Sequence, residues 1–281
     1  MVALTPIVPG QVVEIADGVR RITAPNPGMM TGPGTNTYII GHDELIMVDP
    51  GPDLDAHRDV LLNAVGDRLR SIVCTHTHRD HSPLAVQIRA KTGAPVLGFG
   101  VVPSDGRQDE DFVPERALAD GDMVECGNHR LRAVHTPGHA SNHLCYLLED
   151  RGILFTGDHV MQGSTVVISP PDGNMQAYFD SLDKVLGLPI QMFAPGHGFV
   201  IEQPYEEVHR LVAHRLAREA KILASLQATG PVDLTQLVSH AYAEVSERLH
   251  TAAMRSLHAH LIRLQCLGRV EEANGIWKVV D

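Results

Sequence analysis

Short hydrophobic runs, each closed by glycine, proline or polar residues, follow one another along this chain up to residue 204. Runs of this length that are rich in β-branched residues are typical of buried strands. They span residues 37–40, 45–48, 71–75, 95–97, 132–136, 153–156 and 192–194. Helical patterns occupy residues 53–70 and 83–92 between them. Strands that alternate with helices and then group again predict layers of sheets and helices rather than a helical bundle.

The pattern changes after Pro204. Apolar residues then recur mostly at intervals of three and four, which indicates a long amphipathic helix: Val208, Leu211, Val212, Leu216, Ala220, Leu223 and Leu226. Residues 234–243 and 249–267 predict two more helices, and residues 269–271 and 276–280 predict a hairpin around an Asn274-Gly275 turn. We therefore predict a domain of residues 1–204 and a second of residues 205–281, in which a linking helix precedes a small winged-helix-like unit.

Composition adds information on size and compartment. A chain of 281 residues can bury a large core beside a small second unit. No apolar run reaches the length of a membrane span, and residues 1–10 lack the features of a secretory signal. The cysteines are scattered without the spacing of a metal site or a disulfide framework: Cys74, Cys126, Cys145 and Cys266. We therefore expect reduced thiols, a cytoplasmic location and no membrane partner.

Three histidines and an aspartate lie within six residues, directly after the predicted strand 71–75. They are His76, His78, Asp80 and His81. A strand that ends and turns at this point directs such side chains into one cavity, which a continuing strand would not do. A ligand set of imidazoles and carboxylates, with no thiolate, is suited to zinc and can also bind iron or manganese. A solvated polar turn is the alternative for this segment taken alone.

Three further predicted strands end in a potential ligand. His139 follows Pro137-Gly138, Asp158 follows Gly157, and His197 follows Pro195-Gly196. Glycine and proline interrupt strands because glycine permits unusual dihedral angles and proline has no amide donor. Four strands that each deliver a ligand predict a metal site at one edge of a sheet.

These motifs resemble those of the metallo-β-lactamase-fold superfamily. The signature HxHxDH is met in full by residues 76–81, and TPGH (136–139), TGD (156–158) and PGHG (195–198) follow in the family's order. The resemblance implies an α+β fold, namely a four-layer αβ/βα sandwich with its site at one sheet edge. It implies two metal ions, one held by His76, His78 and His139, the other by Asp80, His81 and His197, with Asp158 between both.

Other residues are assigned around this site by resemblance and by position. The strand 45–48 and Asp49 resemble the family's opening strand and acidic turn, which implies that Asp49 supports the ligands from behind. His143 is a candidate to orient a ligand or contact substrate, or a structural histidine. Ser164 and Thr165 lie in the loop 163–173, which is a candidate substrate wall or an ordinary surface connection. The C-terminal winged helix resembles that of the β-lactamase-like protein 2 group; packing against the rest of the protein is its simpler role.

Two divalent metal ions, zinc in the first place and iron or manganese otherwise, predict a hydrolase. A hydroxide bridging the metals would attack the substrate, with Asp80 orienting it and moving its proton as the catalytic residue. The sequence has no Gly-x-Ser-x-Gly elbow and no cysteine beside a motif. Direct hydrolysis is therefore expected, rather than a covalent intermediate.

The sequence predicts the type of reaction more closely than the substrate. A small molecule with an ester-type bond, a thioester or lactone, is the first hypothesis, and a single-strand endoribonuclease of the β-lactamase-like protein 2 type is the second. A net charge of −11 disfavours RNA as a partner, because nucleic-acid affinity rests on neutralising phosphates. A β-lactamase side activity and a di-iron oxidoreductase rank lower, and a non-catalytic binding module would require lost ligands. Association into a homo-oligomer stays open.

Overall fold

The computed structural model describes residues 6–280. It divides into two compact units. The first contains the described residues up to Thr136, together with Asn142–Ser164 and Leu188–Pro204. The second contains Pro137–Ser141, Thr165–Gly187 and the described residues from Tyr205 onward. Segments from the middle of the chain thus group with its C-terminal part.

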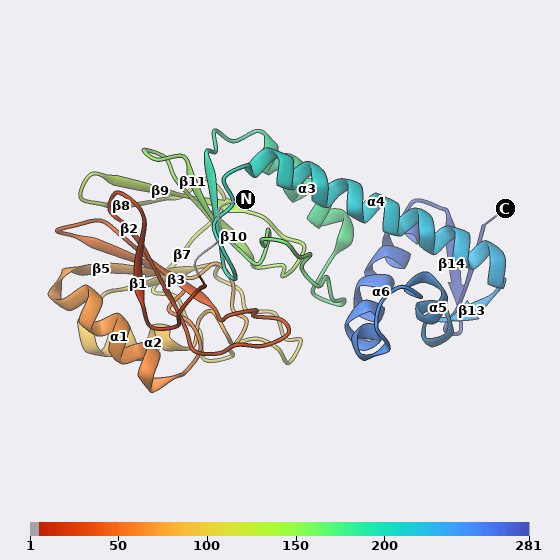
Figure 1. The fold of residues 1–281 in the computed structure, drawn as a ribbon, viewed down its shortest axis with the longest axis horizontal. Helices are drawn as coiled ribbons and strands as arrows, with labels where there is room; N and C mark the ends of the chain where they lie inside the picture. Colours follow the sequence, from red (N-terminus) through yellow and green to blue (C-terminus); the bar gives the residue numbers. More distant parts are fainter. Residues whose placement is uncertain (1–5, 281) are drawn as a thin grey trace. The chain divides into compact units, whose positions relative to one another are not determined.

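The first unit is built on two β-sheets (Figure 1). The seven-stranded sheet has the order β1 (Val12–Ala16), β2 (Val19–Thr23), β3 (Asn36–Ile40), β4 (Leu45–Val48), β5 (Leu69–Val73), β6 (Val96–Gly98) and β7 (Arg116–Ala117). The five-stranded sheet has the order β12 (Met192–Pro195), β11 (Ile153–Gly157), β10 (Leu144–Leu148), β9 (His129–His135) and β8 (Met123–Cys126). The runs predicted as strands from the hydrophobic pattern all form strands.

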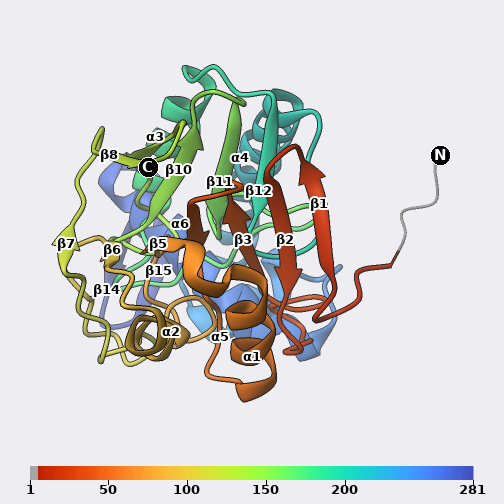
Figure 2. The same ribbon diagram turned by 90° about the vertical axis from the view of Figure 1, so that its left-hand side faces the viewer.

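The core of this unit follows from alternation along the strands. Tyr38 and Ile40 of β3 belong to a cluster that also contains residues of the five-stranded sheet, such as Tyr146 and Phe155. Ile39, which lies between them, belongs instead to the cluster with helices α1 (Asp55–Val65) and α2 (Leu84–Thr92). Figure 2 shows these helices over one face of the seven-stranded sheet. Both faces of β3 are therefore buried, which explains its continuous apolar sequence.

Strand directions bring the predicted ligands to one edge. In the seven-stranded sheet β5 runs parallel to β4 and β6. In the other sheet β9 and β11 are both antiparallel to β10, and β11 is parallel to β12. The carboxyl ends of β9, β11 and β12 therefore point the same way. His139, Asp158 and His197 follow these three ends.

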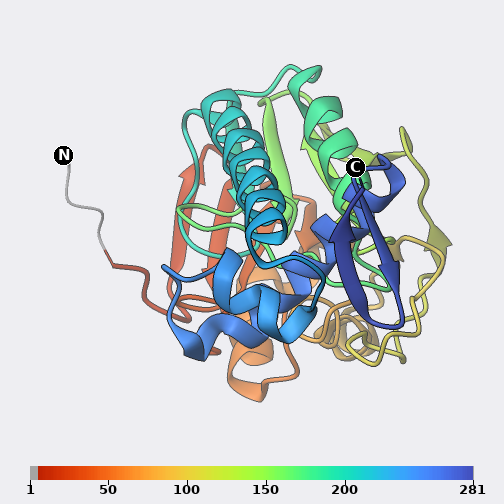
Figure 3. The ribbon, with the colours of Figure 1, turned by 90° about the vertical axis from the view of Figure 1, so that its right-hand side faces the viewer.

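The described part of the second unit contains four α-helices, a short 3-10 helix (Glu247–Leu249) and a small sheet. The α-helices are α3 (Met175–Leu186), α4 (Pro204–Thr229), α5 (Leu234–Ala241) and α6 (His250–Cys266), and the strands are β13 (Val232–Asp233), β14 (Val270–Ala273) and β15 (Ile276–Val279). Its core joins Ile222 and Leu226 of α4 to Leu257, Leu261 and Trp277. The blue segments of Figure 3 show α5, α6 and the hairpin that follows them. The predicted helices and the hairpin are confirmed.

Two differences from the sequence-based prediction concern helices. The helix expected over residues 53–70 covers only Asp55–Val65, and a strand already begins at Leu69. The helix α3 was not predicted; Asn174 caps its amino end by accepting a hydrogen bond from the amide of Ala177 at 2.9 Å. Within residues 6–280, no helix combines the length and apolar content that crossing a bilayer requires.

Candidate metal centre

The structure gathers all seven predicted ligands into three overlapping groups. In each group the ligand atoms lie within 4.8 Å of one another. The groups are His76, His78 and His139; His76, His81 and Asp158; and Asp80, His81 and His197. The first and third correspond to the two predicted metal sets, and the second joins them through Asp158.

His76 and His78 direct ring nitrogens at each other from the turn after β5. His76 Nε2 and His78 Nδ1 are 2.9 Å apart, and His76 Nδ1 lies 3.0 Å from the hydroxyl of Thr75. Two imidazole nitrogens at such a distance form a hydrogen bond only if one carries the proton. Two nitrogen atoms this close together could instead both bind one cation.

The Asp80, His81 and His197 group has the spacing of a coordination shell. His197 Nε2 is 3.3 Å from Asp80 Oδ2 and 3.3 Å from Asp158 Oδ1. His81 Nε2 is 3.5 Å from Asp158 Oδ1 and 3.7 Å from Asp80 Oδ2. The ligand atoms of a tetrahedral zinc ion lie about 3.3 Å apart, since each bond is about 2.0 Å long. His81 Nε2 is buried and has no hydrogen-bond partner within the described part of the chain, so this atom fits a metal ligand.

The electrostatics of the site favour positive charge. Burial opposes protonation of His81, but Asp80, Asp158 and Asp49 raise its pKa well above the ordinary value. The pKa of His197 is raised against burial by Asp158 and Asp80. The pKa of Asp80 is lowered to about 2, because His81 and His197 outweigh the effect of burial. A divalent cation would be stabilised by the same carboxylates.

Asp49 supports His81 from behind, at the end of β4. Its Oδ2 lies 2.9 Å from His81 Nδ1, so the other ring nitrogen of His81 is directed toward Asp80 and Asp158. Thr75 donates to both carboxylate oxygens of Asp49, from its amide and from its hydroxyl, each at 2.7 Å. Such a carboxylate behind a histidine fixes the tautomer and orientation of a metal ligand.

His143 occupies a similar supporting position beside Asp158. Its Nε2 accepts a hydrogen bond from the amide of Asp158 at 3.2 Å, and its Nδ1 lies 3.0 Å from the hydroxyl of Thr136. Gly157 permits this approach: its φ is +46°, and a Cβ there would meet His143 Nε2 at 2.7 Å. His143 therefore contacts the backbone of a predicted ligand and is fully buried.

His139 belongs to the second unit, where the segment before α3 holds it. Its Nδ1 lies 2.8 Å from the carbonyl of Val167, which leaves Nε2 for the ligand group. The amide of Asn174 donates to the carbonyl of Gly138 at 2.8 Å, and the amide of Ser141 donates to Asp172 at 3.0 Å. The TPGH loop is thus fixed at several points.

Ser164 and Thr165 were predicted as residues of a substrate wall. They lie between β11 and α3, where Ser164 is exposed and Thr165 half-buried. A role in substrate binding stays a prediction for both.

Two threonines that support the site were not predicted from the sequence. One is Thr75, described above; the other is Thr35, whose hydroxyl lies 3.5 Å from Asp80 Oδ2. Thr35 is fully buried and pairs with His197 in an isolated β-bridge. The signal for Thr75 was its place directly before the first histidine of the motif. Thr35 lies 45 residues before Asp80, and nothing local to either residue indicated the contact.

Comparisons with known proteins identify both parts of the chain. The model of the metallo-beta-lactamase superfamily matches residues 30–197, which is more than half of the chain. The model of the beta-lactamase associated winged helix domain matches residues 234–277. The resemblance drawn from the motifs, and the fold class with its winged helix, are therefore confirmed.

Individual relatives agree with these family models. A beta-lactamase-like protein 2 homolog of Drosophila melanogaster is 30% identical, over 92% of this chain and 91% of its own length. An atrochrysone carboxyl ACP thioesterase of Aspergillus fumigatus is 26% identical, over 92% of this chain and 85% of its own. The crystal structure of a beta-lactamase domain protein from Burkholderia ambifaria superposes with a TM-score of 0.82 at 22% identity, covering 99% of this chain and 96% of that one.

Proposed function

Because this chain belongs to the metallo-beta-lactamase superfamily, we propose that it is a dinuclear metal-dependent hydrolase of ester-type bonds in small molecules, thioesters before lactones. Membership of this family and the similarity to relatives named as thioesterases support hydrolase chemistry. The observation that carries the proposal is the convergence of seven ligand side chains in three overlapping groups. No expected ligand is missing, which argues against a non-catalytic protein.

The residues divide into two metal sets. His76, His78 and His139 would hold one divalent ion, and Asp80, His81 and His197 the other, with Asp158 reaching both. Bound there, zinc ions would polarise the substrate carbonyl and provide a nucleophilic water at neutral pH. Histidine and carboxylate ligands fit zinc and leave iron and manganese as alternatives.

Asp80 is the catalytic residue in this proposal. Its low pKa of about 2 keeps it a carboxylate at neutral pH, so it accepts a hydrogen bond from the attacking water and orients it. Thr35 is placed to hold Oδ2 of Asp80, and Asp49 holds His81, so the ligand side chains need little reorganisation during the reaction.

The substrate class rests on relatives and on charge. Two of the similar proteins are named as thioesterases, one of them as an atrochrysone carboxyl ACP thioesterase. The net charge of −11 disfavours a polyanion such as RNA. We also propose a reducing location such as the cytoplasm, because the spacing of the cysteines in the sequence does not resemble a disulfide framework. We also propose residues 1–204 as the catalytic domain and residues 205–281 as an appended domain.

A paired substrate panel tests this function. Zinc-quantified protein is incubated with acyl N-acetylcysteamine thioesters and lactones in one arm, and with single-stranded RNA in the other. We expect the wild type to cleave thioesters, to lose this activity when zinc is removed and to regain it when zinc is added back. Asp158→Ala should show no cleavage with or without added zinc. RNA cleavage that is lost in the same variant, without acyl cleavage, would replace this proposal with an endoribonuclease.

A further inference from the structure

A third threonine, Thr77, lies between the predicted ligands His76 and His78 and is buried. The signature HxHxDH leaves its position open. The hydroxyl of Thr77 donates a hydrogen bond to Oε1 of Gln108 and accepts one from Nδ2 of Asn142, both at 2.7 Å. These three residues all belong to the first unit. Thr77 therefore joins three separate segments of that unit at one buried oxygen atom.

The main chain around Thr77 is held by the segment that carries Gln108. The carbonyl of Thr77 accepts a hydrogen bond from the amide of Asp109 at 2.6 Å, and His78 pairs with Gln108 in an isolated β-bridge. Arg79 donates from Nε to the carbonyl of Gln108 at 3.2 Å. Gln108 and Asp109 therefore contact three consecutive residues of the metal-binding motif.

Asn142 lies on the other side of the hydroxyl. Its segment is attached to the same part of the chain, because the amide of Leu144 donates to the carbonyl of Thr75 at 2.7 Å. Asn142 and Gln108 are both buried, at 1% and 0% exposure. The hydrogen bonds to Thr77 thus cross a buried region between two segments that are themselves fixed to the motif.

The two amide side chains depend on Thr77. Within residues 6–280, the other polar atoms of these side chains, Nε2 of Gln108 and Oδ1 of Asn142, are buried without a hydrogen-bond partner. Removing the hydroxyl would leave both side chains buried and unsatisfied, which is costly in a region that water does not reach. The segments would then rearrange to find other partners, and the turn between them would move.

The geometry of the turn shows which groups such a movement would displace. His76 Nε2 and His78 Nδ1 are 2.9 Å apart, so both imidazoles lie on the same side of the chain. Side chains two residues apart in an extended segment share a face, and the residue between them has the other face. Fixing Thr77 on its own face therefore fixes the main chain from which both imidazoles extend.

We propose that Thr77 is a positioning residue of the metal centre, whose hydroxyl sets the relative orientation of His76 and His78 through Gln108 and Asn142. The inference rests on the proposed function, because that function assigns the two histidines to one divalent ion. Thr77 acts through the main chain that it shares with them, and it reduces the rearrangement that metal binding requires. Replacing a hydrogen-bonded group behind metal ligands typically weakens metal binding by about 10- to 100-fold.

The first test compares Thr77→Val, which keeps the branched shape without the hydroxyl, with Thr77→Ser, which keeps the hydroxyl. Zinc affinity is measured by competition with a chromophoric chelator. Visible spectra are recorded with saturating cobalt(II), because its d–d bands report the geometry of the ligands. Thr37→Val is the control: Thr37 is fully buried in the same unit, and its hydroxyl lies 2.9 Å from Nε2 of His57, which is not a predicted ligand.

We expect Thr77→Val to bind zinc about 10- to 100-fold more weakly than the wild type and to shift the cobalt bands at saturation. Thr77→Ser should restore both properties toward the wild type. Thr37→Val should lower the melting temperature but keep the zinc affinity and the spectrum. General destabilisation changes the melting temperature but not the spectrum of a saturated site, so the spectrum identifies a positioning role.

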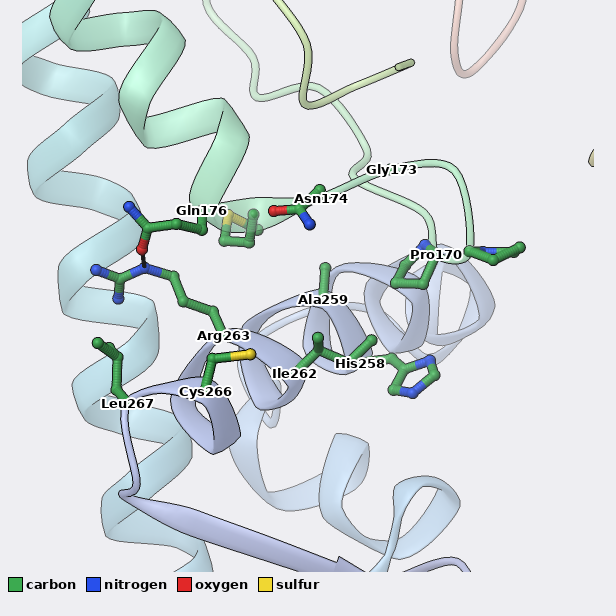
Figure 4. Close-up of a pocket in the computed structure, with 12 residues that line it drawn as sticks. Pro170, Gly173, Asn174, Gln176, His258, Ala259, Ile262, Arg263, Cys266 and Leu267 are labelled. Atoms are coloured by element: carbon green, nitrogen blue, oxygen red, sulfur yellow. Dashed lines mark hydrogen bonds between the residues drawn. The ribbon is translucent and has the colours of Figure 1, made fainter. Parts of the chain in front are cut away.

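The second test asks whether Thr77 and Gln108 act together. Gln108→Met removes the acceptor at similar side-chain length, and we expect the double variant with Thr77→Val to lose less zinc affinity than the product of the two single effects. Gln176→Met is the control. Gln176 lines a cavity of about 650 Å³ in the second unit, where its Oε1 accepts a hydrogen bond from Nε of Arg263 at 2.8 Å (Figure 4). This variant should keep the wild-type zinc affinity.

Wild-type zinc affinity and an unchanged cobalt spectrum in Thr77→Val would overturn the positioning role, as would independent effects in the double variant. If Thr77→Val does not fold, Gln108→Met is judged by the same affinity and spectrum against Gln176→Met. A wild-type protein that binds neither zinc nor cobalt would instead defeat the metal centre, and with it the proposed function.

Discussion

At the scale of single residues, His57 couples folding to pH. It lies in α1 with its Nε2 2.9 Å from the hydroxyl of Thr37, and burial lowers its pKa to about 4. In the unfolded chain a histidine has a pKa of about 6.5, so between about pH 4 and 6.5 the unfolded chain binds more protons than the folded one. The contribution of His57 to the free energy of unfolding is therefore fully present above about pH 6.5. It is lost as the pH drops toward about 4, by about 3 kcal/mol in total.

We expect His57→Gln to remove most of this dependence. The amide of glutamine can keep a hydrogen bond to Thr37 but does not titrate. Urea unfolding of metal-free protein at pH 7.5 and pH 4.5 should show that the wild type loses about 2–3 kcal/mol more than the variant. Equal losses in both proteins would assign the acid sensitivity to other groups.

Asp80 is the residue on which the proposed chemistry depends most. Asp80→Asn keeps the shape but removes the charge that orients water, so we expect kcat to fall by about 10²–10³-fold. Near-native circular dichroism and melting temperature should accompany this loss. The rate is measured at a determined zinc stoichiometry, because Asp80 is also a predicted ligand. A variant with two bound metals and the wild-type kcat would exclude Asp80 from the mechanism.

At the scale of elements, α4 supports the segment that holds His139. Arg215 on α4 is buried, donates to the carbonyl of Val166 and lies over the ring of Tyr178 at 5.4 Å. The neighbouring carbonyl, of Val167, meets His139 Nδ1. Removing Arg215 leaves a buried carbonyl without its charged donor and loosens this support.

We expect Arg215→Met to weaken zinc binding about tenfold at the site that contains His139. The matched control is Arg218→Met, because Arg218 lies one turn later on α4 but donates to Ala241 and Glu244 instead. A chromophoric chelator titration of both variants measures the effect. Equal zinc affinity in the two variants would contradict this role of Arg215.

The elements also show what the sequence could predict. Strands and their terminal ligands were predictable because apolar runs and the Gly or Pro residues after them are local signals.

The helix over residues 53–70 was predicted too long because Leu69 continues a local apolar pattern, whereas its strand pairing is with distant Leu45. Gly66, with a φ of +52°, ends the helix earlier. The signal for α3 was present, since Asn174 caps it and Met175, Tyr178, Leu182 and Val185 share a buried face.

At the scale of the whole molecule, the charge distribution separates the two substrate classes. The net charge is −11, and several cations of the second unit are already paired within it. Arg218 and Lys221 contact Glu244, Arg263 contacts Glu219, and Lys278 contacts Glu271. Affinity for RNA comes largely from counterions that leave the phosphates when protein cations neutralise them. A cation that is already paired with a carboxylate neutralises a phosphate poorly, so it adds little affinity for RNA.

We therefore expect no saturable binding of single-stranded RNA below about 10⁻⁴ M protein at physiological salt. The measurement is fluorescence anisotropy of a labelled oligoribonucleotide at 50 and 200 mM salt. The Asp158→Ala variant is used, with its zinc content determined, so that cleavage does not alter the signal. Micromolar affinity that falls steeply with salt would show that local basic residues, of which Arg255 on α6 is exposed, override the net charge. Charge reversal at Arg255 would then be the next variant, since a phosphate contact there would reduce the salt dependence by about one unit of slope.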